Sequence, residues 1–600
     1  MKTLRFAHAA ASEHTDFAIV GAGISGLYSA LRLLEKHPNA SFTLIERLNR
    51  TGGRLDTDLI EIRPGEIVRE EEGGMRFNYD MTELMRLIRK LNLCDQIVDF
   101  PMASSVEVQG EKINTNRFDL RDCNFLAADG SKPDPTIWAE IYNLKDEERG
   151  KSPVEIVTNA YHAVLIDNGW PIPTHQTPDD WTKFRNEAKW DGVAMNQWQM
   201  WGLLRKMGHS EECIQMLSES IGFAGPFKAP INAGDAFQIL ADFPKDPSYH
   251  TFKEGFSTLP NAVIKALPDN VKVVLSTNVD SVSKTKDQFE LALTQAPDGF
   301  NSYAHVHGGV SKSLTADTLI VATASQSMVR LFQSSPALNQ APDAQTLWNH
   351  LRAVRPMKLM KINLYFDRPW WQNGDLVEPP VEYGPNFTSL PINAVYPFYA
   401  LEDPANARSV MASNAGNALL AAEQIPNEAS ALTIYCDFDN TNFWAGLQSV
   451  GPKFDSPLQR QHSKPPQTLF PASVKVVKEA KKQLEKLFSI SAVPEPLLTS
   501  YRLWDGEDDF EFAYHQYRVG VDDRVVRDYL AKPFNGVHFC NEAISDMQGW
   551  VNGSLRSCDA MLAAFGVEPL DGPVCEQAQA AAASTKQATA PRRLGGLWGN

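Results

Sequence analysis

Near its start the chain reads Asp16-Phe-Ala-Ile-Val20, followed directly by Gly21-Ala-Gly23-Ile-Ser-Gly26. The apolar run predicts a buried strand, residues 27–36 predict a helix, and residues 41–45 predict a second strand. A strand, a glycine-rich turn, a helix and another strand in this order make up the βαβ unit. The sequence therefore predicts a parallel α/β arrangement at this end of the chain.

The glycines and the residue after the second strand indicate a dinucleotide site. Gly21 makes the tight turn, Gly23 lets the backbone approach a pyrophosphate, and Gly26 lets the helix pack closely on the strand. Glu46 follows the second strand, where a carboxylate accepts hydrogen bonds from ribose hydroxyls and repels the extra phosphate of NADP. The alternative is a glycine-rich turn with a purely structural role, and this segment does not choose between FAD and NAD.

Length and composition describe a large globular chain with an acidic balance. Its 600 residues are 43% hydrophobic and 22% charged, which suggests roughly three to five domains, or fewer with large insertions. The formal net charge of −16 disfavours nucleic acid and anionic membranes as partners. No run approaches the ~20 apolar residues of a spanning helix, so we expect no membrane segment.

The cysteines favour a reduced, cytoplasmic protein, with secretion kept as the alternative. Seven cysteines are scattered along the chain without CxxC spacing, so the sequence predicts neither a metal site nor a disulfide framework. Reduced thiols fit the cytoplasm. Residues 1–14 also lack the sustained apolar run of a secretory signal.

Further along the chain, the pattern changes from strands to helices and back. Ser152-Pro153-Val-Glu155 supplies an N-cap, a first-turn proline and a capping-box glutamate, and helices are expected from there to about residue 245. Strands are expected at 271–275, 317–324, 361–366, 394–399 and 537–540, and helices at 474–487 and near 550–565. Residues 575–600 are rich in Ala, Gln and Thr and predict a mobile tail.

Three more motifs accompany the glycine turn. They are Thr51-Gly-Gly53-Arg54-Leu55, Glu72-Gly-Gly74-Met75-Arg76-Phe77, and Asn541-Glu542-Ala-Ile-Ser-Asp-Met-Gln-Gly549-Trp550-Val551-Asn-Gly-Ser554. In this order and spacing, over roughly residues 15–570, the chain resembles the flavin-dependent amine oxidase family. Within that family it is most similar to the L-amino acid oxidases.

The resemblance implies an α/β fold with three parts. A Rossmann-like FAD-binding domain of the amine oxidase and glutathione reductase type would comprise residues 15–78, 246–330 and 501–570. A mixed-sheet substrate domain would comprise residues 79–150 and 331–500, and a helical insertion would span residues 151–245.

The resemblance also implies FAD and assigns residues to it. Glu46 would hold the adenosine ribose, Arg54 would lie against the pyrophosphate, and the backbone of Val279 would contact the adenine. Glu542 would bond the ribityl–phosphate region, although the family usually has glycine where Asn541 stands. The expected cofactor-binding residues are Gly21, Gly23, Ile24, Ser25, Gly26, Glu46, Arg47, Gly53, Arg54, Gly74, Met75, Arg76, Val279, Glu542, Gly549, Trp550 and Val551.

Two features describe how the flavin would be held. Some relatives attach flavin through the cysteine of a Ser-Gly-Gly-Cys-Tyr run, but the equivalent stretch here, Tyr514-His-Gln-Tyr-Arg518, has no cysteine. We therefore expect non-covalent FAD. A helix starting near Trp550 would direct its N-terminus at the flavin and favour the negative charge of the reduced ring.

The resemblance assigns the substrate-binding residues as well. Arg76 would bind the substrate carboxylate through its two-pronged guanidinium, with a surface or pyrophosphate-contacting arginine as the alternative. Tyr396 would donate its hydroxyl to the same carboxylate, with a plain core tyrosine as the alternative. Lys361 would be the catalytic lysine that holds a water at the flavin, because Trp370-Trp371 follow it at the family's spacing; Lys358 is the competing choice. Gly549 and Trp550 would wall the site.

These residues imply oxidative deamination of an L-amino acid by FAD and O₂, giving a 2-oxo acid, ammonia and hydrogen peroxide. The alternatives are an amino acid 2-monooxygenase, a monoamine or polyamine oxidase, and a flavin-binding scaffold without turnover. Residues 507–511, which are mostly acidic, favour basic substrates only if they lie near the pocket. Relatives are often dimers, so a homodimer is a further expectation.

Overall fold

The structure is a computed structural model. It describes residues 13–108, 111–130, 135–173, 176–241, 249–296, 309–401, 427–462, 469–506 and 511–576. The N-terminal residues, most of the acidic stretch after residue 506 and the tail beyond residue 576 lie outside the described residues.

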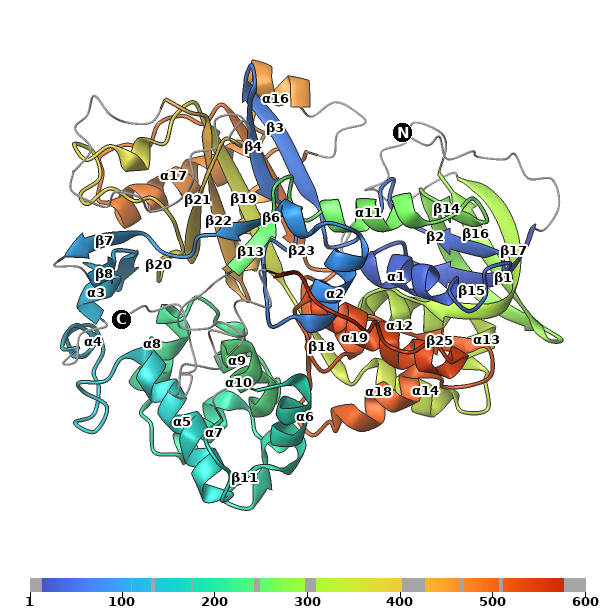
Figure 1. Cartoon of the computed structure of the whole chain (residues 1–600). Helices are drawn as coiled ribbons and strands as arrows, with labels where there is room; N and C mark the ends of the chain where they lie inside the picture. Colours follow the sequence, from blue (N-terminus) through green and yellow to red (C-terminus); the bar gives the residue numbers. More distant parts are fainter. Residues whose placement is uncertain are drawn as a thin grey trace.

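The first sheet is assembled from three separate stretches of chain (Figure 1). Its strands in spatial order are β14 (Val271–Val274), β2 (Phe42–Ile45), β1 (Glu13–Val20), β17 (Val310–Val321), β16 (Gln288–Gln295) and β15 (Thr277–Thr285), with β25 (Val537–Phe539) paired to β17. The pairs β1–β2, β2–β14, β1–β17 and β17–β25 are parallel, whereas β15, β16 and β17 run antiparallel. The α/β class and the strands expected at both ends of the chain are confirmed.

Helices cover both faces of this sheet. One face carries α1 (Ile24–Leu33), α2 (Thr82–Lys90), α11 (Thr258–Ala266) and α19 (Val551–Leu562). The other carries α12 (Ser325–Ser334), α13 (Pro336–Asn339), α14 (Ala344–Leu351) and α18 (Asp523–Ala531). Because apolar side chains line both faces, the central strands form a continuous buried core, as parallel sheets require.

The second sheet is mixed and stands beside the first. Its order is β10 (Cys123–Leu126), β9 (Arg117–Leu120), β20 (Asn386–Thr388), β21 (Ala394–Tyr399), β22 (Ser430–Asp437), β19 (Leu359–Phe366) and β23 (Leu498–Trp504). Side chains alternate along β19: Met360, Ile362 and Leu364 pack against the amphipathic helix α17 (Val474–Phe488). The opposite face is covered by a hairpin of β3 (Thr57–Arg63) and β4 (Glu66–Glu71).

A group of helices lies at the bottom of Figure 1, below both sheets. It contains α5 (Pro153–Asp167), α6 (Pro178–Glu187), α7 (Met200–Lys206), α8 (Glu211–Ser220), α9 (Gly225–Lys228) and α10 (Ala233–Ala241), with a small hairpin of β11 (Lys189–Trp190) and β12 (Val193–Ala194). The capping box is present at the start of α5, where Ser152 Oγ accepts from the Glu155 backbone and Glu155 accepts from the Ser152 backbone. Asp235 of α10 and Asp523 of α18 share the buried Arg185, at 3.2 Å and 2.9 Å, which ties these helices to the first sheet.

Smaller elements complete the connections. They are β5 (Phe77–Asn78), β6 (Ile97–Phe100), β7 (Ser105–Val108), β8 (Glu111–Asn114), α3 (Ala127–Gly130), α4 (Ile137–Ile141), β13 (Tyr249–Phe252), β18 (Val354–Met357), α15 (Asn440–Gln448), α16 (Pro457–His462) and β24 (Tyr514–Tyr517). Within the described ranges, no helix combines the length and the apolar character needed to cross a membrane.

One expectation about the cysteines is wrong. Cys94 and Cys575 form a disulfide across 481 residues of sequence, so the thiols are not all reduced. The sequence predicts a mobile tail that starts at Cys575. In the structure this residue is fully buried against the helices that cover the first sheet. Such a distant pair leaves no spacing signal in the sequence, which is why cysteine counting missed it.

We expect the replacements Cys94→Ser and Cys575→Ser each to destabilise the protein by about 2–4 kcal/mol, because a covalent link restricts the unfolded chain. Thermal unfolding with and without reductant measures the effect. Cys123→Ser, which removes a free and half-buried thiol, is the control and should leave the reductant sensitivity unchanged. If the denatured, unreduced protein were alkylated at both Cys94 and Cys575, the pairing would be refuted.

Candidate active site

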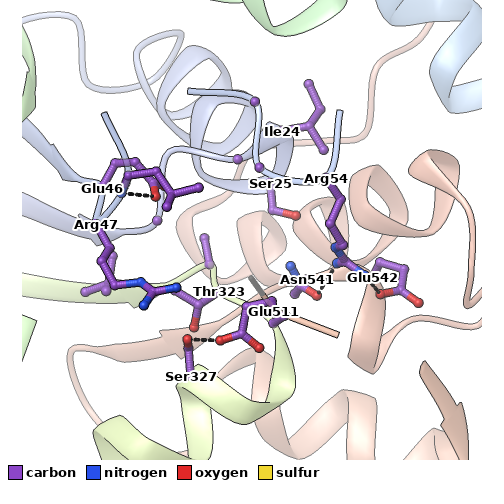
Figure 2. Close-up of a pocket in the computed structure, with 18 of the residues that line it drawn as sticks. Ile24, Ser25, Glu46, Arg47, Arg54, Thr323, Ser327, Glu511, Asn541 and Glu542 are labelled. Atoms are coloured by element: carbon purple, nitrogen blue, oxygen red, sulfur yellow. Dashed lines mark hydrogen bonds and ion pairs between the residues drawn. The ribbon is translucent and has the colours of Figure 1, made fainter. Parts of the chain in front are cut away.

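A cavity of about 700 Å³ runs along the carboxyl ends of the parallel strands. It begins at Glu46 and Val279, passes the glycine turn and the N-terminus of α1, and ends at Gly549, Trp550 and Val551. Figure 2 shows its central part, with Glu46 and Arg47 at one side, Arg54 and Glu542 at the other, and Ser25 between them. Cavities at the carboxyl ends of an open α/β sheet are the usual ligand sites of such folds.

At one end of this cavity, Glu46 is fixed by two backbone amides. Its Oε2 accepts from Ala22 N and its Oε1 accepts from Leu48 N, both at 2.9 Å. A carboxylate has about four acceptor positions, so two remain for ribose hydroxyls. Arg47 and Val279 line the same end of the cavity.

Next to the glycine turn, the cavity wall contains buried hydroxyls that lack partners. Ser25 Oγ in α1 and Thr323 Oγ1 after β17 accept and donate no hydrogen bond within the described residues. Buried polar atoms are rarely left unsatisfied unless a ligand or water completes them. Together with the amide groups at the start of α1, these donors fit a diphosphate. The residues present therefore fit a flavin dinucleotide.

Gly26 explains why α1 can approach the turn so closely. A Cβ atom on Gly26 would lie 2.0 Å from the carbonyl oxygen of Gly21. The close helix–strand packing expected from the glycine motif is therefore present. It depends on the absence of a side chain at Gly26, which lies within α1.

A buried ionic cluster closes the far end of the larger cavity. Arg54 donates to Glu542 Oε2 at 2.6 Å and to Asn541 Oδ1 at 3.1 Å. Glu542 Oε1 accepts from the backbone of His515 at 3.1 Å and of Gly549 at 2.7 Å, and His515 Nδ1 lies 2.9 Å from Oε2. Burial raises the pKa of Glu542, but Arg54 and His515 more than offset this and lower it to about 2.

This cluster gives Glu542 a role that the motif alone did not reveal. Its oxygens accept hydrogen bonds from the protein, so it ties the loop before α19 to Arg54 and to β24. Asn541 also accepts from Ala543 N and so starts the short turn that carries Glu542. The departure from the family's glycine is thus accommodated by a side-chain cap.

A second cavity of about 140 Å³ adjoins the first. The two share Arg54, Leu55, Gly74, Trp504, Ala513, Gly549, Trp550 and Val551. Its other lining residues include Glu72, Met75, Arg76, Lys361 and Tyr435. The smaller cavity therefore brings together motifs that are about 480 residues apart in sequence, since residues 72–76 and 549–551 face each other there.

Arg76 lines the smaller cavity and is only 7% exposed. Its guanidinium carbon lies 4.9 Å from the centre of the Tyr249 ring and 5.8 Å from that of Tyr396. Burial opposes the charge of Arg76, but the tyrosine hydroxyls, chiefly that of Tyr396, raise its pKa overall. Arginine is in any case charged at every physiological pH, so this wall presents a desolvated positive charge. Tyr396 is buried beside Arg76, outside the set of residues that line the two cavities.

Lys361 reaches the smaller cavity from β19. Its Nζ donates to the carbonyl oxygens of Glu71 at 2.6 Å and Gly73 at 2.8 Å. Because the side chain is buried, the pKa of Lys361 is lowered to about 8. The competing lysine is Lys358, whose Nζ lies 3.5 Å from Oδ1 of Asn442 in α15. It is not among the lining residues of either cavity.

Gly549 and Trp550 stand where the two cavities meet. Gly549 has a φ of +87°, a region that favours glycine. The Trp550 ring is stacked on Tyr249, with centroids 6.2 Å apart and planes inclined by 14°. The helix expected near Trp550 begins at Val551, so its N-terminus faces the cavities.

Several lining residues were not among the site residues expected from the sequence. They are Thr323, Ser327 and Glu511 in the larger cavity and Glu72, Phe223, Ile239, Tyr435 and Tyr514 in the smaller one, with Trp504 in both. Glu511, where the acidic stretch 507–511 ends, accepts from Ser327 at the larger cavity and does not line the smaller one. Glu72 alone could have been noticed, since it begins the second glycine motif.

Comparison with known proteins agrees with this geometry. Residues 24–429 match the family of flavin containing amine oxidoreductases, and the chain belongs to that family. It is therefore a flavoprotein oxidoreductase of the amine oxidase class.

Individual relatives are distant. Achacin of Lissachatina fulica is 23% identical over 535 residues, 87% of each chain. An uncharacterized protein of Acanthamoeba polyphaga mimivirus is 21% identical over 573 residues, 92% of this chain and 93% of the other. Solved structures with the same fold include putrescine oxidase bound to putrescine, with a TM-score of 0.58, 15% identity and coverage of 93% of this chain and 100% of that chain. Cyclohexylamine oxidase from Brevibacterium oxydans IH-35A has a TM-score of 0.56 and 14% identity over 92% of this chain and 98% of that chain.

Proposed function

We propose that this protein is an L-amino acid oxidase, which converts L-amino acids and O₂ to 2-oxo acids, ammonia and hydrogen peroxide. The observation that carries this proposal is the buried guanidinium of Arg76 in the wall of the smaller cavity. A desolvated cation beside a ligand cavity strongly favours an anionic group on the ligand. An α-carboxylate supplies that group, whereas a simple amine gains nothing from it.

The residues that line the two cavities bind the substrate and orient it. When bound along the larger cavity, FAD would supply the redox chemistry, with the substrate as the reductant and O₂ as the oxidant. Arg76 fixes the carboxylate, Trp550 limits the space beside it, and Gly549 offers its carbonyl to the substrate amine. Lys361 holds the backbone just before Arg76 in place through the Glu71 and Gly73 carbonyls. Positioning by these groups accounts for most of the rate enhancement.

We further propose that FAD is held without a covalent bond. No cysteine occurs among the described residues that line the two cavities, and β24 contributes Tyr514 and His515 near them. We expect acid precipitation to release all yellow colour into the supernatant. Colour that stays with the precipitate would refute this expectation.

The products of aerobic turnover test the proposed reaction. An oxidase yields the 2-oxo acid, ammonia and peroxide in equal amounts, whereas a monooxygenase yields an amide and carbon dioxide. We expect the first set, measured by mass spectrometry together with a peroxide assay. Amide as the main product would contradict an oxidase.

An amine without a carboxylate is the second candidate substrate. Glu72 is an acidic residue among those that line the smaller cavity, and an acidic residue there could favour an ammonium. The structural neighbours named for putrescine and cyclohexylamine belong to this second class. We favour amino acids because a monoamine offers Arg76 no anionic partner, and a diamine would bring a second ammonium group of like charge toward it.

A further inference from the structure

One face of β19 forms a buried polar stripe that leads away from the smaller cavity. Lys361, Asn363 and Tyr365 alternate along this strand and point to the same side. Ser500 of β23 and Thr433 of β22 lie opposite Asn363 in the sheet register. A sheet that is covered on both faces usually carries apolar side chains on both of them, so this polar stripe requires an explanation.

The hairpin that covers the stripe contributes three carboxyl groups. Asp58 of β3 pairs with Glu70 of β4 in register, and Glu72 follows two residues later on the same face. Glu70 and Glu72 are 0% and 1% exposed. Like charges directly opposite each other destabilise a sheet, so ionising Asp58 and Glu70 together is costly.

The hydrogen bonds around these carboxyls are incomplete. Glu72 Oε1 accepts from Ser500 Oγ at 2.6 Å and Asn363 Nδ2 at 3.2 Å, and Glu70 Oε2 accepts from Thr433 Oγ1 at 2.7 Å. The other oxygens, Asp58 Oδ2, Glu70 Oε1 and Glu72 Oε2, accept no hydrogen bond from any described residue. Asp58 and Glu72 lie within hydrogen-bonding reach of each other. A proton between them satisfies two of these three oxygens.

Burial and the neighbouring carboxylates outweigh the nearby cations at two of these carboxyl groups. Burial, with the charges of Glu72 and Asp56, raises the pKa of Asp58 well above its usual range. Burial also raises the pKa of Glu70 to about 8. The other charged groups that face this cluster are Arg502 of β23, with Nε 4.0 Å from Glu72 Oε2, Asp56 and Arg50 before β3, Glu71 of β4 and Lys361 of β19.

Glu72 belongs to this cluster and also lines the smaller cavity beside Lys361. We propose that Asp58 and Glu72 share one proton and act together as the acid–base group of the amino acid oxidation. The pair accepts the proton of the substrate ammonium before oxidation and gives it back when oxygen is reduced. This inference rests on the proposed function.

The proton balance closes within one turnover. The substrate ammonium loses one proton to the pair. The flavin, when bound, would serve as the acceptor of the two electrons and the proton of the Cα–H bond. Reduction of O₂ to hydrogen peroxide consumes two electrons and two protons. One of these protons comes from the broken Cα–H bond, and the pair supplies the other. The imino acid then takes up water and releases ammonia without a net change in protons.

Infrared spectroscopy of the resting holoenzyme tests the shared proton without turnover. We expect a carboxylic-acid carbonyl band that shifts in D₂O and disappears in both Asp58→Asn and Glu72→Gln. Glu70→Gln should remove a separate band. Glu61→Gln, on the exposed side of the same hairpin, is the matched control and should change neither. A band that survives in Asp58→Asn and Glu72→Gln would overturn the proposal.

A proton count tests the same group during reaction. When the oxidised wild-type enzyme is mixed anaerobically with a substrate amino acid in a weakly buffered dye solution, we expect almost no proton release. The Glu72→Gln variant should release about one proton per flavin reduced, because the pair can no longer retain it. Release of a full proton by the wild type would overturn the proposal even if the variants fail to fold. If no amino acid reduces the flavin, the proposed function fails instead, and the infrared bands still decide the shared proton.

Discussion

Replacing Arg76 with alanine should lower kcat/KM for L-amino acids by about 150- to 5000-fold, mainly through KM. The substrate carboxylate would lose a buried, charge-assisted partner, and breaking such a pair costs about 3–5 kcal/mol. Bound flavin should remain, because the residues that fix the larger cavity, such as Glu46 and Arg54, are untouched. Peroxide formation as a function of amino acid concentration measures the effect.

Two controls separate substrate binding from general damage at Arg76. Arg76→Lys keeps the charge but loses the two-pronged geometry, so it should recover only part of the affinity. Arg117→Ala removes another buried arginine, one whose guanidinium donates to Pro379 O and which lines neither cavity. It should lower stability while leaving KM unchanged. If Arg76→Ala had wild-type KM, Arg76 would have no role in substrate binding.

Replacing Gly26 with alanine should abolish flavin binding. The new methyl carbon would lie 2.0 Å from the Gly21 oxygen, so α1 must move away from the turn. Overpacking of this kind costs about 1–3 kcal/mol or more, and the movement also displaces the amides at the start of α1. We expect the purified variant to be colourless and to unfold at a lower temperature, as measured by absorbance and calorimetry.

Gly446→Ala is the matched control for this substitution. Gly446 lies in α15. Apart from its chain neighbours and the backbone of its own helix, no atom comes within 4 Å of an added methyl carbon. Alanine is a better helix former than glycine by about 1 kcal/mol, so stability should be equal or slightly higher. A yellow, fully stable Gly26→Ala protein would show that the turn does not constrain the flavin site.

The parts that could be read from sequence are those where local chemistry fixes the backbone. The apolar run before Gly21 is a central parallel strand, and the capping signals at Ser152 and Glu155 start a helix at Pro153. In each case the residues that determine the local structure lie within the element or next to it. The same holds for the amphipathic pattern of residues 474–487, which is confirmed in α17.

The parts that could not be read depend on contacts between distant segments. Nothing near Cys94 in the sequence points to Cys575, and nothing near Arg54 points to Glu542 and His515. The three carboxyls of the β3–β4 hairpin resemble an ordinary acidic surface until the register places them on β19. Such sites depend on how the segments of the fold are assembled, which no single stretch records.

Anaerobic reduction of the flavin by a matched pair of ligands tests the central claim most directly. L-phenylalanine and phenethylamine share an amine and an aromatic side chain and differ in the carboxylate that Arg76 would bind. We predict that the amino acid bleaches the flavin absorbance rapidly and that the amine does so far more slowly. Equal or faster bleaching by the amine would contradict a carboxylate site at Arg76.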